Sequence, residues 1–104
     1  MDRVAFKMTL LPGNEVEYQK RHDEIWPELT TLLKQADICE YSIFLDQETN
    51  SLFGFLKAED KTQLDSLPAQ AIMQKWWAYM SDIMVTNPDH SPISQPLKEV
   101  FYLP

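Results

Sequence analysis

Tyr18 and His22 are the residues of this sequence whose types and spacing suggest acid–base chemistry. If they belong to a helix, side chains four positions apart lie on the same face. Histidine has an ordinary pKa of about 6.5, so it can accept and donate a proton within one reaction cycle. Taken alone, however, such a pair is more often a histidine packed by a tyrosine. The pair therefore identifies a candidate without deciding its role.

Three further aromatic residues could line a binding pocket: Tyr41, Trp76 and Trp77. Neighbouring residues on a helix point about 100° apart, so one indole could face the core and the other a pocket. Flat rings stack against the C–H faces of sugars, and the indole N–H adds a polar contact; two core-filling rings would explain the sequence equally well. Tyr41 shares an inward register with Cys39 and Ile43, and a buried hydroxyl there needs either a structural partner or a substrate.

The spacing of the remaining reactive residues argues against other chemistries. The histidines are His22 and His90, and neither has a Cys or His neighbour at metal-ligand spacing, so no metal is expected. Two glycines leave no glycine-rich phosphate loop, and no serine stands in a nucleophile-elbow motif. Cys39 lacks a placed histidine and is expected to be a small buried hydrophobe. The sequence predicts no cofactor and leaves acid–base catalysis or ligand binding.

Composition narrows the setting of this chemistry. The chain has 104 residues, 44% of them hydrophobic, and a formal net charge of −7; this suits one domain over residues 1–104. An acidic surface repels phosphate backbones, so nucleic acid is not an expected partner. Cys39 is the single cysteine, early charges at Arg3 and Lys7 argue against a signal peptide, and no apolar run approaches the roughly 20 residues that span a bilayer. We therefore expect a soluble, cytoplasmic protein without a membrane partner.

Hydrophobic periodicity predicts the elements that must position these residues. Alternation predicts strands over 3–10, 39–45, 52–58 and 97–103, with a hairpin loop at 47–50 and a loop over 87–96. Helices are expected from Asn14 to just before Pro27, from Pro27 onward, after Asp60, and from Pro68 to Met84. The loop that contains Asn87-Pro88-Asp89 is fully explained as a turn, although its polar groups could also help to close a pocket.

The resulting order, β-α-β-β-α-β, predicts an α+β fold of the ferredoxin-like type, with helices on one face of an antiparallel sheet. Residues 52–56 are apolar at alternate positions on both sides, so the other face is not expected to be polar. That face would be covered by a second subunit, line a ligand cavity, or do both in a dimeric α/β barrel. We expect a homodimer rather than a monomer, because exposing such a patch is costly.

Taken in order, these residues resemble the L-rhamnose mutarotase family over nearly the whole chain. The features that carry the resemblance are Tyr18-x-x-x-His22, Ile25-Trp26-Pro27-Glu28-Leu29, Tyr41, Trp76-Trp77 with Tyr79-Met80, Asn87-Pro88-Asp89 and Val100-Phe101-Tyr102-Leu103-Pro104. Each is weak alone, but their order on so short a chain is highly specific. The sequence departs mildly at Asp23-Glu24, which could raise the pKa of the neighbouring His22, and at His90.

The resemblance implies a homodimeric α/β barrel and an isomerase that interconverts the α and β pyranose anomers of L-rhamnose by ring opening and closure. His22 matches the family's proton donor and would protonate the ring oxygen. Tyr18, Tyr41, Trp76 and Trp77 match its sugar-binding positions. A Tyr hydroxyl, a carboxylate or a water could serve as the base.

Two other interpretations share this fold. Cofactor-free monooxygenases and their haem-degrading relatives also place Trp and His around a substrate, although the Tyr18/His22 pair followed by Ile25-Trp26-Pro27-Glu28 is not expected of them. A non-catalytic binding domain would use His22 only as a hydrogen-bonding group. Fold alone cannot separate these three functions.

Overall fold

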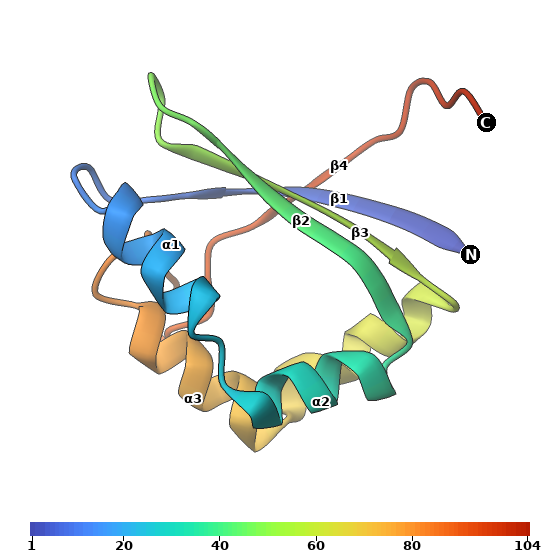
Figure 1. Ribbon diagram of the computed structural model, residues 1–104, viewed down its shortest axis with the longest axis horizontal. Helices are drawn as coiled ribbons and strands as arrows, with labels where there is room; N and C mark the ends of the chain where they lie inside the picture. Colours follow the sequence, from blue (N-terminus) through green and yellow to red (C-terminus); the bar gives the residue numbers. More distant parts are fainter.

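The computed structural model describes residues 1–104, and the order of its elements agrees with the predicted one (Figure 1). They are β1 (Asp2–Thr9), α1 (Glu15–Asp23), α2 (Pro27–Gln35), β2 (Ile38–Asp46), β3 (Ser51–Ala58), the 3₁₀ helix η1 (Lys61–Ala69), α3 (Ala71–Met80) and β4 (Gln95–Leu97). The four strands form one antiparallel sheet in the order β2-β3-β1-β4. This is the ferredoxin-like strand order, so the predicted α+β fold is confirmed.

The inner face of the sheet forms one wall of the core, and all the helices lie on this side of the sheet (Figure 1). β1 and β3 pair along their whole length, and Met8 stands opposite Leu52. Because opposed residues share a face, both point toward the helices, where both are buried. Met73, Trp76 and Met80 of α3 belong to the same apolar cluster. The alternation that predicted these strands therefore also predicted the face that they bury.

Pro27 divides the first crossover into two helices, as predicted. α1 ends at Asp23 and α2 begins at Pro27, whose fixed φ and missing N–H suit the first helical position. Leu29 anchors α2 in the core with 2% of its surface exposed. The break lets α1 take a different direction from α2 and approach the C-terminal end of α3 (Figure 1), where Arg21 bonds the Tyr79 carbonyl.

A β-bulge in β2 changes the face of its first residues. Between Cys39 and Ser42, β2 uses one residue more than its partner β3, and Glu40 has a φ of 49°. Cys39 stands opposite Lys57 on the outer face and is only partly buried. The prediction that Cys39 points inward as a buried hydrophobe is therefore wrong. The extra residue keeps Tyr41 on the inner side, as predicted.

The last strand is shorter and begins earlier than predicted. β4 comprises Gln95–Leu97 and pairs with the middle of β1, whereas alternation predicted a strand over 97–103. The segment after Leu97 has no ladder partner and is held through side chains instead: the Arg3 guanidinium lies 3.4 Å from the centre of the Tyr102 ring and bonds Glu99. The alternation of apolar residues over 97–103 indicated an extended chain, but it could not show that this segment leaves the sheet after Leu97.

The segment after α3 also differs from its prediction. α3 ends at Met80, whereas apolar spacing predicted a helix as far as Met84. Ile83 and Met84 are nevertheless buried, because the chain turns back beside Leu10, which forms a bridge with Met84. None of the helices has the length and apolar character that crossing a membrane would require.

Candidate active site

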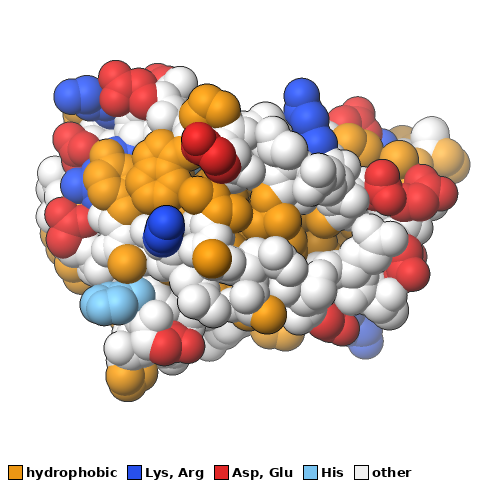
Figure 2. Space-filling model, turned by 90° about the horizontal axis from the view of Figure 1, so that it is seen from below, with side chains coloured by type: hydrophobic (Ala, Val, Ile, Leu, Met, Phe, Trp, Pro, Cys, Tyr) orange, Lys and Arg blue, Asp and Glu red, His pale blue; other side chains and the backbone are white.

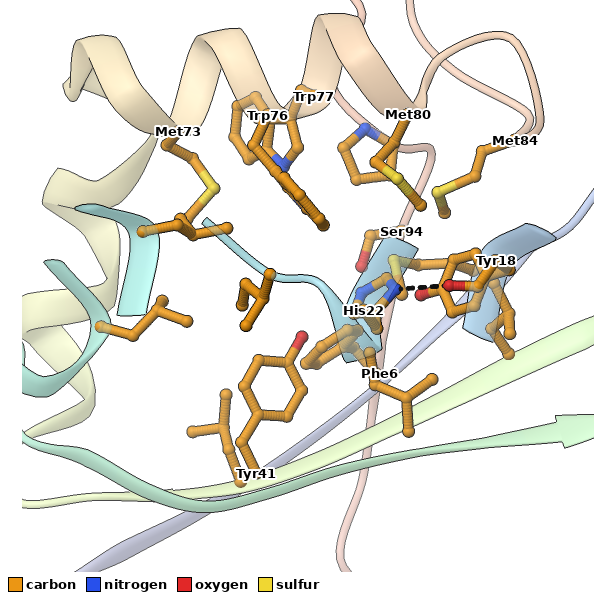
Figure 3. Close-up of a pocket in the computed structure, with 18 of the residues that line it drawn as sticks. Phe6, Tyr18, His22, Tyr41, Met73, Trp76, Trp77, Met80, Met84 and Ser94 are labelled. Carbon is orange, nitrogen blue, oxygen red and sulfur yellow. Dashed lines mark hydrogen bonds between the residues drawn. The ribbon is translucent and has the colours of Figure 1, made fainter. Parts of the chain in front are cut away.

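A cavity of about 1340 Å³ lies between the inner face of the sheet and the helices (Figure 3). Of its 35 lining residues 24 are hydrophobic, so the few polar groups that reach it are the candidates for chemistry. Seen from the helical side, hydrophobic side chains gather across the middle of the molecule and acidic side chains lie mostly toward its margins (Figure 2). The structure brings all five predicted site residues to this cavity: Tyr18, His22, Tyr41, Trp76 and Trp77.

His22 is held in one tautomer by the turn of helix that precedes it. Its Nδ1 lies 3.0 Å from the backbone carbonyl oxygen of Tyr18 (Figure 3). A carbonyl only accepts hydrogen bonds, so Nδ1 carries the proton and the neutral ring has its lone pair on Nε2. Nε2 has no hydrogen-bond partner in the protein. Every buried polar side-chain atom does have one, so Nε2 is not among the buried atoms. Nε2 is therefore open to the cavity and can accept a proton from a ligand.

Burial keeps His22 neutral near physiological pH. Removal of the ring from water lowers its pKa below the ordinary value, and this outweighs the Tyr18 carbonyl and the Asp23 charge, which both raise it. The sequence suggested a raised pKa because Asp23 and Glu24 follow His22. That direction is wrong, although Asp23 does act in the predicted sense. At neutral pH the resting His22 is thus a proton acceptor.

Two tyrosine hydroxyls accompany His22. Tyr18, on the same helix, has its ring centre 4.3 Å from that of His22. Tyr41 comes from β2, just after the bulge, and its hydroxyl points into the cavity (Figure 3). Although 39% of the Tyr41 surface is accessible, the apolar surroundings of the hydroxyl raise its pKa to about 12. Burial, followed by the nearness of Tyr41, also raises the pKa of Tyr18. Both phenols therefore remain protonated and can donate hydrogen bonds.

The two adjacent tryptophans of α3 both line the cavity, so they are not divided between core and pocket. Trp76 is the more deeply buried, with 7% of its surface exposed, and its ring stands perpendicular to His22 at a centre-to-centre distance of 5.4 Å. It also packs edge-on against Trp26 at 5.1 Å. Trp77 is only partly buried. Trp76 is thus part of both the core and the cavity wall, while Trp77 is the more exposed of the two rings.

Several residues of the site were not singled out in the sequence. Phe6 stands edge-on to Tyr41, with ring centres 6.2 Å apart, and its inward register on β1 could have indicated this. It packs over Gly54, where a Cβ would collide with its ring. Ser94 directs its hydroxyl into the cavity (Figure 3), but a lone serine before an edge strand carries no sequence signal. Arg21 does not line the cavity, but it bonds Glu17, the Tyr79 carbonyl and Asp82.

The loop after α3 contributes to the cavity wall, whereas its histidine does not. Ser91 and Pro92 line the cavity, and Asn87 donates a hydrogen bond from Nδ2 to the Ser91 hydroxyl. His90 occupies an exposed left-handed position with a φ of 71° and is not among the lining residues. No three His, Cys, Asp or Glu side chains lie together as a metal site would require. Among the five predicted site residues, the groups available for chemistry are one neutral imidazole, two neutral phenols and the indole rings.

Three comparisons relate this chain to known proteins. A profile of the L-rhamnose mutarotase family matches residues 3–103. L-rhamnose mutarotases of Mesorhizobium japonicum and Rhizobium leguminosarum bv. trifolii are each 54% identical to the chain; the first match covers 98% of this chain and 97% of the relative, the second 100% and 98%. A crystal structure of an L-rhamnose mutarotase from Formosa agariphila superposes with a TM-score of 0.94 at 50% identity, covering 100% of both chains. An antibiotic biosynthesis monooxygenase at 12% identity, with a TM-score of 0.61 and coverage of 94% and 97%, shares the fold.

Proposed function

The chain belongs to the L-rhamnose mutarotase family, and from this premise we propose that its cavity interconverts the α and β pyranose anomers of L-rhamnose, an isomerase reaction. The observation that carries the proposal is the state of His22: Nδ1 donates to the Tyr18 carbonyl, and Nε2 is left unpaired beside the Trp76 ring. A base of this kind in an aromatic cavity suits a polyhydroxylated ligand that has exposed C–H faces.

The reaction requires only movement of a proton. The anomeric hydroxyl loses its proton, the bond between C1 and the ring oxygen breaks, and the ring oxygen gains a proton. The open aldehyde then rotates about the C1–C2 bond and the ring closes on the other face. No bond to the protein forms, and nothing is oxidised or reduced. One proton-transfer residue with an ordinary contribution of about 100- to 10,000-fold is sufficient.

His22 is assigned both halves of this transfer. Because its pKa is lowered, it begins neutral, and Nε2 accepts the proton of the anomeric hydroxyl. The imidazolium then donates from Nε2 to the ring oxygen, which is bonded to the same carbon. This keeps the role of acid at the ring oxygen that the sequence suggested for His22 and assigns the base to the same side chain. The Tyr18 carbonyl, by accepting from Nδ1, steadies the ring in both charge states.

The other four residues bind and orient the sugar. The hydroxyls of Tyr18 and Tyr41 remain protonated, so they donate to sugar oxygens. Trp76 and Trp77 offer ring faces and edges for the C–H side of the pyranose. The methyl group of L-rhamnose suits a cavity whose lining is mostly apolar. Holding the sugar in this way supplies the orientation that proton transfer needs.

The proposal is tested by proton exchange spectroscopy on L-rhamnose at anomeric equilibrium. A trace of protein is expected to produce exchange between the two anomeric signals, which interconvert slowly in water alone. Parallel samples of L-fucose and D-mannose measure the breadth of specificity. Exchange that stays at the uncatalysed rate for all three sugars would contradict the proposal. Saturable binding without exchange would then indicate a binding domain, and oxygen uptake with a quinol would indicate a monooxygenase.

We further propose that the enzyme is a homodimer in which a second copy covers the outer face of the sheet. Phe44 on β2 is 66% exposed there and stands opposite Phe53 of β3. Near the C-terminus, Val100, Phe101 and Leu103 are 77–87% exposed. Exposed apolar area of this kind is typical of an interface. We also propose that the domain of residues 1–104 lies in the cytoplasm, because Cys39 is a free thiol, as is usual in a reducing compartment.

The dimer is tested by sedimentation velocity. The parent chain is expected to sediment as a dimer, and Phe44→Asp is expected to shift it toward the monomer, because a carboxylate buried in an apolar interface is costly. Val16→Asp is the matched control: Val16 is 79% exposed but lies on α1, on the helical side. A monomeric parent, or a Phe44→Asp protein that sediments like the parent, contradicts the proposed interface.

A further inference from the structure

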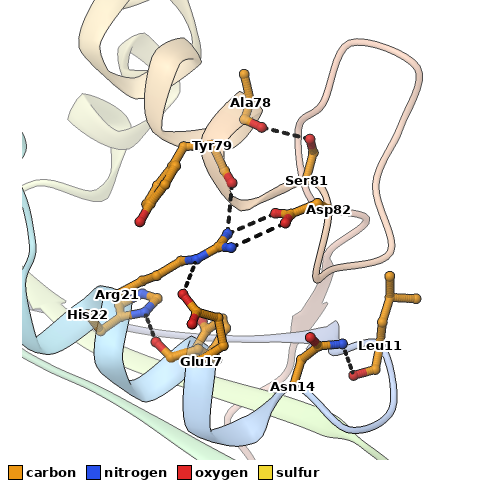
Figure 4. A network of polar contacts seen from close by, with 10 residues as sticks. Leu11, Asn14, Glu17, Arg21, His22, Ala78, Tyr79, Ser81 and Asp82 are labelled. Atoms are coloured by element: carbon orange, nitrogen blue, oxygen red, sulfur yellow. Dashed lines mark hydrogen bonds and ion pairs between the residues drawn. The ribbon is translucent and has the colours of Figure 1, made fainter.

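Arg21 precedes His22 on α1 but points toward the C-terminal end of α3 (Figure 4). Its Nε donates to Glu17 at 2.8 Å, and Nη1 donates both to the backbone carbonyl of Tyr79 and to Asp82, each at 2.8 Å. Nη2 completes a bidentate pair with Asp82 at 3.2 Å. The guanidinium also lies 4.6 Å from the centre of the Tyr79 ring. One side chain therefore ties two segments that are about sixty residues apart in the sequence.

These contacts are more than a solvated surface ion pair. Only 11% of the Arg21 side chain is exposed, although 65% of the Asp82 side chain is, so water screens the pair with Asp82 mainly from the side of the carboxylate. The fork geometry of the guanidinium serves three acceptors at once, which an ammonium group cannot reproduce. The contacts of Arg21 therefore fix direction as well as separation between the two helices.

α1 depends on this connection because little else holds it. It is the one helix without close backbone packing against another element, and Tyr18 is its only buried residue. Its composition is largely polar, so apolar burial orients it only through Tyr18. Yet α1 carries both Tyr18 and His22. The position of the proton-transfer residue thus rests on a helix that is anchored mainly through side-chain contacts.

The contacts of Arg21 lie close to the point where the His22 ring contacts α3. Arg21 is adjacent to His22, and Tyr79 lies one helical turn beyond Trp76, whose ring is 5.4 Å from the His22 ring. We propose that Arg21 is a positioning residue for proton transfer: through Tyr79 and Asp82 it holds α1 against α3 and fixes His22 opposite Trp76. This inference rests on the proposed function. A displacement of about 1 Å at a reacting group is enough to cost on the order of 100-fold in rate.

The test compares Arg21→Met with Arg3→Met in the full-length protein. Arg3 is a matched control, because it also pairs with a carboxylate, Glu99, and lies over a tyrosine ring, Tyr102, but it belongs to β1 and does not line the cavity. Arg21→Met is expected to lower kcat for L-rhamnose exchange by about 10- to 100-fold and to change KM by less than about fivefold. Arg3→Met is expected to leave both near the parent values. Both are measured at a temperature at which circular dichroism shows a folded chain.

A second readout follows the His22 imidazole itself by NMR titration. Burial lowers its pKa in the parent, so a loosened α1 that admits water is expected to raise it toward the ordinary value, and loss of the Arg21 charge acts in the same direction. Unchanged kcat and pKa in Arg21→Met, or an equal kcat loss in Arg3→Met, overturns the assignment. If Arg21→Met does not fold, Asp82→Asn replaces it and a smaller loss of kcat is expected; kcat alone is then the readout, because loss of the Asp82 charge lowers the pKa of His22. If the parent itself does not exchange anomers, the proposed function fails, and the titration alone then decides the role of Arg21.

Discussion

Replacing His22 by alanine is expected to slow anomer exchange by about 100- to 10,000-fold, the usual contribution of one positioned acid–base group. Sugar binding should change far less, because the other groups assigned to the sugar lie on Tyr18, Tyr41, Trp76 and Trp77. The measurement is the exchange rate between the anomeric NMR signals over a range of L-rhamnose concentrations, which separates kcat from KM. A His22→Ala protein that keeps more than half of the parent rate would show that the proton-transfer residue is misassigned.

His22→Asn is the matched control for this prediction. The asparagine amide can take the place of the Nδ1–H group and donate to the Tyr18 carbonyl, but it offers nothing in place of Nε2. Its fold and the orientation of α1 should therefore stay close to those of the parent. We expect His22→Asn to lose as much activity as His22→Ala, because the lost function is that of the Nε2 lone pair and not that of the helix contact.

The same assignment fixes the pH dependence. Burial lowers the pKa of His22 below the ordinary 6.5, so the reactive neutral form predominates at neutral pH. The parent rate should reach a plateau toward neutral pH and fall about tenfold per pH unit once the pH is below the lowered pKa. The unfolded chain binds a proton at His22 more readily than the folded one, so stability also declines as pH falls through this range, and His22→Ala should remove that part of the decline.

The fold was largely predictable because most of its helices and strands have local sequence signals. The alternation of Val4, Phe6 and Met8 with small or polar neighbours defines β1, and Pro27 separates α1 from α2 through properties of proline alone. The bulge at Glu40 was not predictable, because a left-handed φ at a glutamate has no local signature and depends on pairing with β3. The early position of β4 likewise depends on where the chain meets β1.

The sequence predicted five residues that line one cavity, but it did not predict their chemical state. Spacing placed Tyr18 and His22 on one helical face, residue type and register marked Tyr41 and the tryptophans as candidates, and the resemblance to a family assigned these to the sugar. The proton on Nδ1, however, follows from a carbonyl 3.0 Å away, and the pKa of His22 follows from burial that its sequence neighbours do not reveal. Asp23 alone suggested the opposite direction. Tertiary contacts decide ionisation, and for the same reason the pairing of Arg21 with Asp82 left no pattern in the sequence.

Substitutions of the two tryptophans of α3 are expected to differ in their effects on the stability of the fold and on L-rhamnose binding. Trp76 is 7% exposed and packs against Trp26 and His22, so Trp76→Ala should lower the free energy of unfolding by about 3–5 kcal/mol, the cost of emptying a core aromatic site. That is a large part of the stability of a small domain. Trp77 is only partly buried, so Trp77→Ala should cost distinctly less. Urea denaturation of both variants measures this difference.

The binding effects should follow the opposite order when each variant is measured in its folded state. Trp77 lines the cavity and is less buried than Trp76, and an aromatic stacking contact worth about 1 kcal/mol corresponds to roughly fivefold weaker L-rhamnose binding in Trp77→Ala. Trp77→Phe keeps a flat ring and should recover most of that loss. For Trp76 the milder Trp76→Phe is the usable variant, because it retains core packing. If Trp77→Ala binds L-rhamnose as tightly as the parent, Trp77 belongs to the packing of α3, and Trp76 alone then forms the indole wall of the sugar site.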